Sequence, residues 1–241
     1  MPALLTVNDL SKSFGNVVAV HDLSFEVERQ EVLGIIGPNG AGKTTMFNLI
    51  TGEIRPDKGE VIFNGRDVTY SKTYKKCRHG MARTYQIPRP FLNMTVLENL
   101  LVGGIYGAGL AYKQSKDKCE EILVKTGLNH KRNTFAGALP LLDRKRLELA
   151  KALSTDPTLL LVDEVAGGLS EGEVEEVLRI IHSVQEDGVT VLWVEHIVMA
   201  MQRGPDRLLV MNFGQSLYCG EPEEAFKSDE FHKIYLGAEE D

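Results

Sequence analysis

The chain has 241 residues, a formal net charge of −7 and a hydrophobic content of 43%, which suits a globular protein with one domain of above-average size, or with one core domain carrying an inserted subdomain. The acidic balance argues against nucleic acid as the main partner, because phosphate backbones attract basic surfaces. The three cysteines, Cys77, Cys119 and Cys219, are far apart in the sequence, which argues against a disulfide framework or a zinc set and predicts free thiols in a reducing compartment.

The N-terminal third predicts strands around a glycine-rich loop, and its first residues show no secretory signal pattern. Residues 17–20 and 23–27 alternate in the manner of short strands. The continuous apolar run 32–36 predicts a strand that is buried on both faces. After the glycine-rich loop we expect a helix over 44–51 and a strand over 60–64.

The middle of the chain, about residues 95–153, has helical patterning. Thr95 is followed three residues later by Glu98, which is the sequence pattern of a capping box. Further helices are predicted over 113–127 and 144–153. No apolar run in the sequence approaches the ~20 residues that a membrane-spanning helix needs, so we expect any role at a membrane to require a partner.

The last third returns to alternating strands and helices. Buried strands are predicted over 159–162 and 189–194, with an amphipathic helix around 174–181 between them. A hairpin is predicted over 208–218, and one or two short helices over 222–236. Strand and helix alternation around a nucleotide loop predicts an α/β fold with a parallel sheet and helices on both faces.

A phosphate-binding loop is the strongest motif in the chain, because it matches the pattern G-x-x-x-x-G-K-[ST] at every fixed position. Its glycines let successive N–H groups point at phosphate oxygens, and the following helix directs its positive dipole end at the same place. Lys43 adds a full charge for the β- and γ-phosphates, and Thr44 offers a hydroxyl to Mg²⁺. The predicted nucleotide-binding residues of this loop are Gly37, Pro38, Asn39, Gly40, Ala41, Gly42, Lys43, Thr44 and Thr45.

Two carboxylates and a histidine follow the buried strands of the last third. Asp163 and Glu164 end the apolar run 159–162, and His196 follows the run 189–194. The end of the first strand would place Asp163 beside the phosphate loop, where it can hold Mg²⁺ through water. Glu164 would then orient or deprotonate the attacking water, and His196 would face the ligand crevice near the γ-phosphate.

Together these residues resemble the nucleotide-binding domain of ABC transporters, over nearly the whole chain. The resemblance implies that Phe14 stacks on adenine, that Gln86 contacts Mg²⁺ and senses the γ-phosphate, and that His196 is a switch histidine. It also implies ATP and Mg²⁺ as cofactors and a P-loop (RecA-like) core with an N-terminal antiparallel β subdomain. The core would comprise residues 1–86 and 155–241, and a helical subdomain would comprise residues 87–154.

The sequence is most similar to the ATPase subunits of branched-chain amino acid uptake transporters. Residues Arg83–Gln86, Met94–Asn99 and Gly167–Leu169 carry this likeness. It implies a peripheral subunit at the cytoplasmic face of the cell membrane that drives uptake through separate integral membrane permease subunits. A second ATP-binding subunit and, indirectly, a solute-binding protein are the other implied partners. The segment Pro88–Leu101 would help to form the groove for a permease helix, with residues 88–92 as the candidates for contact; the alternative is an ordinary packed loop.

The signature loop of the family, Leu-Ser-x-Gly-Gln, is altered in this chain. Aligning the predicted helix 144–153 places Leu139 to Asp143 there, with Pro140 for serine, Leu142 for glycine and Asp143 for glutamine. Proline removes a hydroxyl and an N–H donor, leucine adds bulk, and we expect Asp143 to bring negative charge near phosphate. The chain is therefore expected to need a partner ATPase with an intact signature, and a homodimer would have two impaired sites.

Other classes of function fit the sequence less well. A nucleotide-binding regulator with little hydrolysis is favoured only by the altered signature and is opposed by Glu164 and His196. A soluble ATPase of the same type that acts on ribosomes or DNA usually has two such domains or a long coiled-coil insertion, and neither is present. A P-loop kinase would lack the order Gln86, Asp163-Glu164 and His196.

Overall fold

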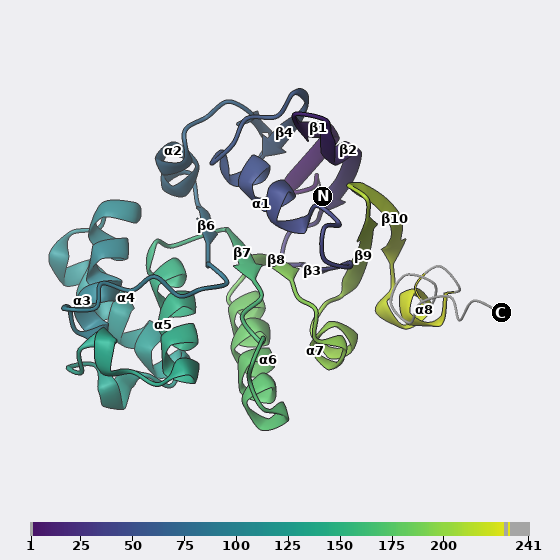
Figure 1. The fold of residues 1–241 in the computed structure, drawn as a ribbon. Coiled ribbons are helices and arrows are strands. Elements are labelled where there is room, and N and C mark those ends of the chain that lie inside the picture. Colours follow the sequence, from purple (N-terminus) through teal and green to yellow (C-terminus); the bar gives the residue numbers. More distant parts are fainter. Residues whose placement is uncertain (1, 229–230, 232–241) are drawn as a thin grey trace.

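A computed structural model describes residues 2–228 and 231 of the chain. It combines a mixed sheet with mostly parallel strands, a smaller antiparallel sheet, and helices on both sides and at one end (Figure 1). The predicted α/β fold class, with a parallel sheet, an antiparallel β subdomain and helices, is confirmed.

The larger sheet of the described residues has six strands in the order β10-β9-β3-β8-β7-β6. Neighbouring strands from β9 to β6 are parallel, and β10 is antiparallel to β9, as the predicted hairpin requires. The fully buried apolar runs form the three central strands, as predicted. The strands are β3 (Val32–Ile36), β6 (Met81–Arg83), β7 (Leu159–Asp163), β8 (Thr190–Val194), β9 (Arg207–Asn212) and β10 (Gln215–Gly220).

The antiparallel sheet contains, within the described part of the chain, four strands in the order β2-β1-β4-β5. They are β1 (Leu5–Phe14), β2 (Val17–Val27), β4 (Lys58–Phe63) and β5 (Arg66–Asp67). The prediction of separate short strands over 17–20 and 23–27 is wrong, because β2 is continuous there. Register shifts against β1 and a positive φ of 45° at Asp22 bend the strand without ending it.

Two groups of helices surround the larger sheet (Figure 1). The first group comprises α1 (Lys43–Thr51), α2 (Thr73–Arg78), α6 (Glu171–Glu186), α7 (Val198–Arg203) and α8 (Pro222–Lys227). The second lies between β6 and β7 in the sequence and comprises α3 (Val96–Val102), the π-helix Gly103–Gly107, α4 (Tyr112–Lys125), the 3-10 turns Asn129–Lys131 and Ala136–Ala138, and α5 (Leu141–Ser154). The predicted capping box begins α3, since the Thr95 hydroxyl accepts from the Glu98 N–H at 3.2 Å.

Two hydrophobic cores lie on the two faces of the six-stranded sheet. Alternate residues of β3 divide between them: Leu33 and Ile35 pack with α1 and the antiparallel sheet, whereas Val32 and Ile36 pack with the opposite core. The core that contains Val32 and Ile36 also includes residues of α3 to α7, and this packing fixes the second group of helices against the sheet. This packing holds the carboxyl ends of the strands rigid, and the candidate site is built there.

Three expectations about the whole chain can be compared with the structure. None of the helices in residues 2–228 has the length and apolar character needed to cross a membrane. Cys77, Cys119 and Cys219 are free, as predicted. Residues 222–227 form α8, whereas most of the remainder of the predicted segment 222–236, and the acidic end at Glu239 to Asp241, lie outside the described residues.

Candidate active site

The phosphate loop, residues 37–42, connects β3 to α1. A Cβ atom on Gly37 would lie 2.3 Å from the Met211 carbonyl oxygen, and one on Gly42 would lie 2.4 Å from that of Ala19. Gly42 also has a φ of +99°, which side-chain-bearing residues rarely adopt. The loop conformation therefore requires glycine at both positions.

Helix α1 begins without a side-chain cap. Its first bond to the loop runs from the Met46 N–H to the Gly42 oxygen at 2.8 Å, so the N–H groups of the preceding turn have no intrahelical acceptor. Such N–H groups, together with the helix dipole, attract phosphate. Residues 39–45 line an open cavity of about 320 Å³ together with Val17, Val18, Ala19 and Glu164, and we call it the phosphate cavity.

The Lys43 side chain lies inside this loop, and the residue is 7% exposed. Its Nζ donates to the carbonyl oxygens of Gly37 at 2.5 Å and Pro38 at 3.0 Å. Burial lowers the pKa of Lys43, and the nearby carboxylates of Glu164 and Asp163 raise it by less. The two predicted carboxylates are therefore within electrostatic reach of the predicted phosphate-binding lysine.

Asp163 ends β7 and is 5% exposed. Its Oδ2 accepts a hydrogen bond from Arg83 Nη2 at 2.8 Å, and Thr84 Oγ1 accepts from its backbone N–H at 3.0 Å. Arg83 thereby balances the charge of a carboxylate that the sheet holds in a buried position. The sequence placed Arg83 in a family motif, but it gave no sign of this ion pair.

Glu164 brings the other predicted catalytic residues together. Its backbone has a φ of +45°, a costly conformation that clusters at functional sites, and its N–H donates to the Val194 oxygen at 2.9 Å. The Gln86 side-chain amide donates to Glu164 Oε2, and His196 Nδ1 lies 3.7 Å from the same oxygen. Glu164, Gln86 and His196 line a second cavity, which we call the His196 cavity.

Two buried charged residues that the sequence analysis missed hold the loop after Glu164. Glu195 is 0% exposed and accepts from the N–H groups of Ala166 at 2.7 Å and His196 at 2.9 Å; burial raises its pKa. Lys145 Nζ donates to the carbonyl oxygen of Val165 at 3.0 Å and to that of Gly167. The only sequence signal was the position of Glu195 directly after the apolar run 191–194, and the sequence around Lys145 gave none.

Phe14, the predicted adenine-stacking residue, ends β1 and is 50% exposed. It pairs with Val17 across the β1–β2 ladder, and Lys12 Nζ lies 5.7 Å from its ring centroid. Phe14 is not among the residues that line the phosphate cavity, whereas Val17 and Val18, which the sequence analysis missed, are. Phe14 is therefore linked to the cavity through its strand partner Val17.

The altered signature region differs from the expectation in two ways. Helix α5 starts at Leu141 with Pro140 as its N-cap, so Leu141, Leu142 and Asp143 form its first turn instead of a loop before it. Asp143 is 4% exposed, and its carboxylate pairs with Lys131 and, at 3.4 Å, with Arg146. The expectation that Asp143 presents negative charge to phosphate is therefore wrong, because its charge is buried and paired.

The residues at the site fit Mg²⁺ in the manner of nucleotide enzymes. No cluster of three or more metal-binding side chains occurs among the described residues, but Mg²⁺ usually takes one or two protein ligands and completes its shell with water and phosphate. Asp163 offers a buried carboxylate that uses only Oδ2 in its hydrogen bond to Arg83. Thr44, the second expected ligand, lines the phosphate cavity.

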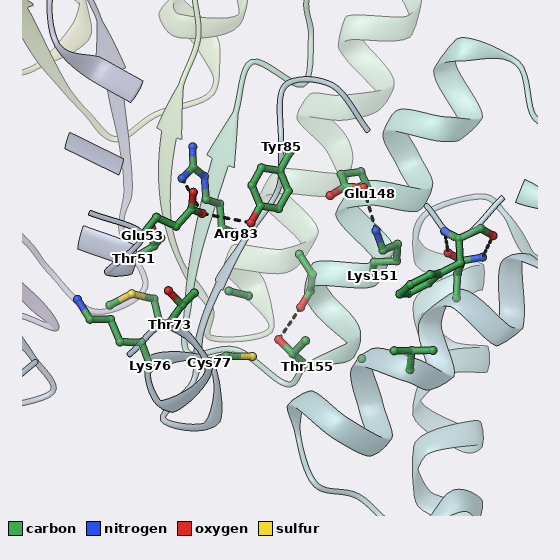
Figure 2. A pocket seen from close by; sticks show the side chains of 17 residues that line it. Thr51, Glu53, Thr73, Lys76, Cys77, Arg83, Tyr85, Glu148, Lys151 and Thr155 are labelled. Atoms are coloured by element: carbon green, nitrogen blue, oxygen red, sulfur yellow. Dashed lines mark hydrogen bonds and ion pairs between the residues drawn. The ribbon is translucent and has the colours of Figure 1, made fainter. Parts of the chain in front are cut away.

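A third cavity, of about 260 Å³, lies between the core and the second group of helices (Figure 2). Its lining comes from the end of α1, from α2, β6, α3 and α5, and we call it the β6 cavity. Its charged lining residues include Glu53, Arg83, Glu148 and Lys151, which Figure 2 labels together with Tyr85. Phe91 also lines the cavity and supplies an aromatic face. Among residues 88–92, which were predicted to receive a permease helix, only Phe91 lines this cavity.

Comparisons with known proteins give one consistent result. Residues 20–167 match the family model described as ABC transporter. The chain is 35% identical to the high-affinity branched-chain amino acid transport ATP-binding protein LivG of Salmonella typhimurium, over 97% of this chain and 98% of the relative. It is 30% identical to the lipopolysaccharide export system ATP-binding protein LptB of Haemophilus influenzae, over 98% of both chains.

Solved structures agree with this result. The ADP conformation of MJ1267, an ATP-binding cassette of an ABC transporter, superposes with a TM-score of 0.90 at 31% identity, covering 98% of this chain and all of that one. A nucleotide-free cassette from an ABC transporter gives a TM-score of 0.89, with the same identity and coverage.

Proposed function

Because this chain belongs to the ABC transporter family, as an ATP-binding ATPase subunit, we propose that it binds Mg·ATP at the phosphate cavity. The hydrolysis of ATP would drive uptake of branched-chain or other amino acids through separate permease subunits. The proposal treats residues 1–86 and 155–241 as the ATP-binding core and residues 87–154 as a helical subdomain. It places the chain peripherally at the cytoplasmic face of the cell membrane.

The position of Glu164 is the observation that carries the proposed hydrolysis. Its side chain lines both the phosphate cavity and the His196 cavity, so it can reach a water molecule between the γ-phosphate and the switch residues. The Gln86 amide and His196 Nδ1 face the same carboxylate oxygen. A phosphate that displaced these groups would leave Glu164 free to orient or deprotonate water.

Each of the other proposed residues has a separate role. The N–H groups of residues 39–45 and the Lys43 ammonium would bind the phosphates, and Phe14 would stack on adenine outside the cavity. Thr44, Asp163 and Gln86 would hold Mg²⁺, which when bound neutralises phosphate charge. Lys145 and Glu195 would fix the loop that carries Glu164, through the hydrogen bonds described above.

The test is the steady-state ATPase activity of the purified chain with Mg²⁺, beside two variants. We expect Glu164→Gln to bind ATP but to turn over about 10²- to 10⁴-fold more slowly, the range of a general base. Lys43→Ala should lose ATP binding itself. Activity of Glu164→Gln equal to that of the wild type would contradict the assignment. If the wild type shows no activity but binds ATP, and Lys43→Ala removes that binding, the result would favour either an obligate heterodimer or the regulator. Adding a partner ATPase with an intact signature would then separate these two.

In this family, the ATP-binding subunits of transporters work with membrane permease components. We propose that a permease helix docks at the β6 cavity. Phe91 is half exposed there, and Asn99 fixes its backbone by hydrogen bonds of 2.8 and 3.1 Å. Phe91→Asp should abolish co-purification with the permease and leave ATP binding intact; an unchanged complex would contradict this docking site.

The signature region supports a heterodimer as the second proposal about partners. The first turn of α5 carries no serine hydroxyl, and Leu141 is 53% exposed on the wall of the His196 cavity. An ATP-binding partner with an intact signature would complete the site of this chain, whereas a homodimer would lack that donor on both sides. The proposed direction of transport is uptake, and reconstituted leucine transport with the permease would test it.

A further inference from the structure

Arg83 contacts both the nucleotide site and the β6 cavity. Its side chain is 7% exposed. Nη2 donates to Asp163 Oδ2 at 2.8 Å, on the nucleotide side. Nη1 donates to Asn48 Oδ1 at 2.6 Å and to Glu53 Oε1 at 3.2 Å, on the cavity side. One guanidinium group thus connects the two sites without an intervening residue.

Glu53 is the member of this group that an occupant of the cavity can reach. Its side chain is 33% exposed, and it lines the β6 cavity with Arg83 and Tyr85. Figure 2 shows the Glu53 carboxylate beside the Arg83 side chain, and its Oε1 also accepts from the Tyr85 hydroxyl at 3.1 Å. A basic or hydrogen-bonding group that entered the cavity would compete with Arg83 for this carboxylate.

Competition for Glu53 would affect Asp163, because both carboxylates pair with the same guanidinium group. A guanidinium group stays protonated at any physiological pH, so its single charge is divided between two carboxylates. The Arg83–Asp163 contact is buried on both sides, where water screens it little. Arg83 Nε is buried without a hydrogen-bond partner among the described residues, so the guanidinium position is a compromise between its partners. Withdrawal of Glu53 would leave Asp163 as the main anion for Arg83.

We propose that Arg83 is a positioning residue that couples the β6 cavity to Asp163, so that an occupant engaging Glu53 changes the affinity of the nucleotide site for Mg²⁺. The inference rests on the proposed function, in which Asp163 holds Mg²⁺. Release of Glu53 strengthens the Arg83–Asp163 pair and weakens Mg²⁺ binding. Because coupling between sites is reciprocal, Mg·nucleotide would in turn change how the cavity binds its occupant.

The test is a thermodynamic cycle on the purified chain, read by binding of a fluorescent ADP across a Mg²⁺ titration. Glu53→Gln imitates an occupied cavity and should raise the half-saturating Mg²⁺ concentration by about fivefold or more, the lower end of typical site-to-site coupling. In an Arg83→Met background the same substitution should shift it by less than about twofold. Glu120→Gln is the matched control, since it removes the same charge from the pair that Glu120 of α4 forms with Arg132.

Each outcome decides between coupling and a merely structural Arg83. The coupling would be overturned if Glu53→Gln shifted the half-saturating Mg²⁺ concentration equally in the wild-type and Arg83→Met backgrounds, or did not shift it at all. If Arg83→Met does not fold, Arg83→Gln replaces it, because a neutral amide has no charge to divide between the two carboxylates; a full-size shift in that background also contradicts the proposal. Nucleotide binding by the wild type that is independent of Mg²⁺ would instead contradict the proposed function.

Discussion

Helices α1 and α5 both begin without a side-chain cap, but their first turns differ in chemistry. The turn before α1 is a glycine loop that leaves N–H groups open to phosphate, with the Lys43 ammonium inside it. The first turn of α5 starts after Pro140 and exposes Leu141. The same helix geometry therefore attracts an anion at the start of α1 and offers an apolar surface at the start of α5.

The two regions differ in what they can bind or complete. The α1 end can receive a nucleotide, because its charges and donors are in place. The α5 end lacks the hydroxyl and the small residue that its family uses to complete the site of a partner. Since Asp143 is buried and paired, the deficiency comes from Pro140 and Leu142 and not from repulsion by Asp143.

The largest expected effect tests the two helix ends directly. Lys43→Ala should weaken ATP binding roughly 100-fold, because hydrogen bonds to a charged group contribute about 1.5–3 kcal/mol each. Leu141→Ala, at the start of α5, should change the ATP affinity of the monomer by less than about twofold. Calorimetric titration of both variants provides the measurement. A large effect at Leu141 would show that the two ends are not separate.

A smaller effect is expected for the buried charge of α5. Asp143→Ala should lower the free energy of unfolding by about 2 kcal/mol, below the range for fully buried pairs, because Lys131 keeps partial access to water. Adding Lys131→Met should recover part of the loss, as urea unfolding would show. Unchanged stability of Asp143→Ala would mean that the carboxylate is free after all.

The last effect appears only at alkaline pH and concerns the far end of α1. Lys76 is 1% exposed, donates to the Ile50 carbonyl oxygen at 2.6 Å, and burial lowers its pKa to about 8. Between that pKa and its ordinary value of 10.5, the unfolded chain binds more protons than the folded chain. The contribution of Lys76 to the free energy of unfolding should therefore rise with pH across this window, by about 1.4 kcal/mol per unit.

The measurement is urea unfolding at several pH values, compared with Lys76→Met. Lys76→Met should lose the rise in the free energy of unfolding with pH. Lys75→Met, at an exposed position of α2 beside Lys76, should keep it. An identical slope in all three proteins would show that Lys76 is not held in a desolvated position.

Some elements of the fold could be predicted from the sequence, and others could not. Continuous apolar runs predicted β3, β7 and β8, and turn chemistry predicted the hairpin of β9 and β10. The short strand β6 and helices α2 and α7 were not predicted, since three to six residues carry too little periodicity. The start of α5 was placed three residues late, because the apolar positions on which the prediction rested, Leu147 to Leu153, lie inside the helix and do not mark its first turn.

The candidate site was predicted unevenly for a related reason. Gln86, Glu164 and His196 follow from motifs, and the structure brings them together; their catalytic roles stay predictions. Arg83, Lys145 and Glu195 are fixed by partners that are distant in the sequence, so no local pattern could reveal them.

The central claim is that this chain has a complete nucleotide site but cannot complete the site of a partner. The most direct test mixes the wild-type chain with a donor that carries Pro140→Ser and Leu142→Gly, together with Glu164→Gln so that it cannot hydrolyse ATP itself. An excess of this donor should raise the ATPase rate of the wild type at least about tenfold, in proportion to heterodimer formed, since single donors to a transition state contribute about 10²-fold or more. A wild-type chain that is fully active alone and unaffected by the donor would contradict the account.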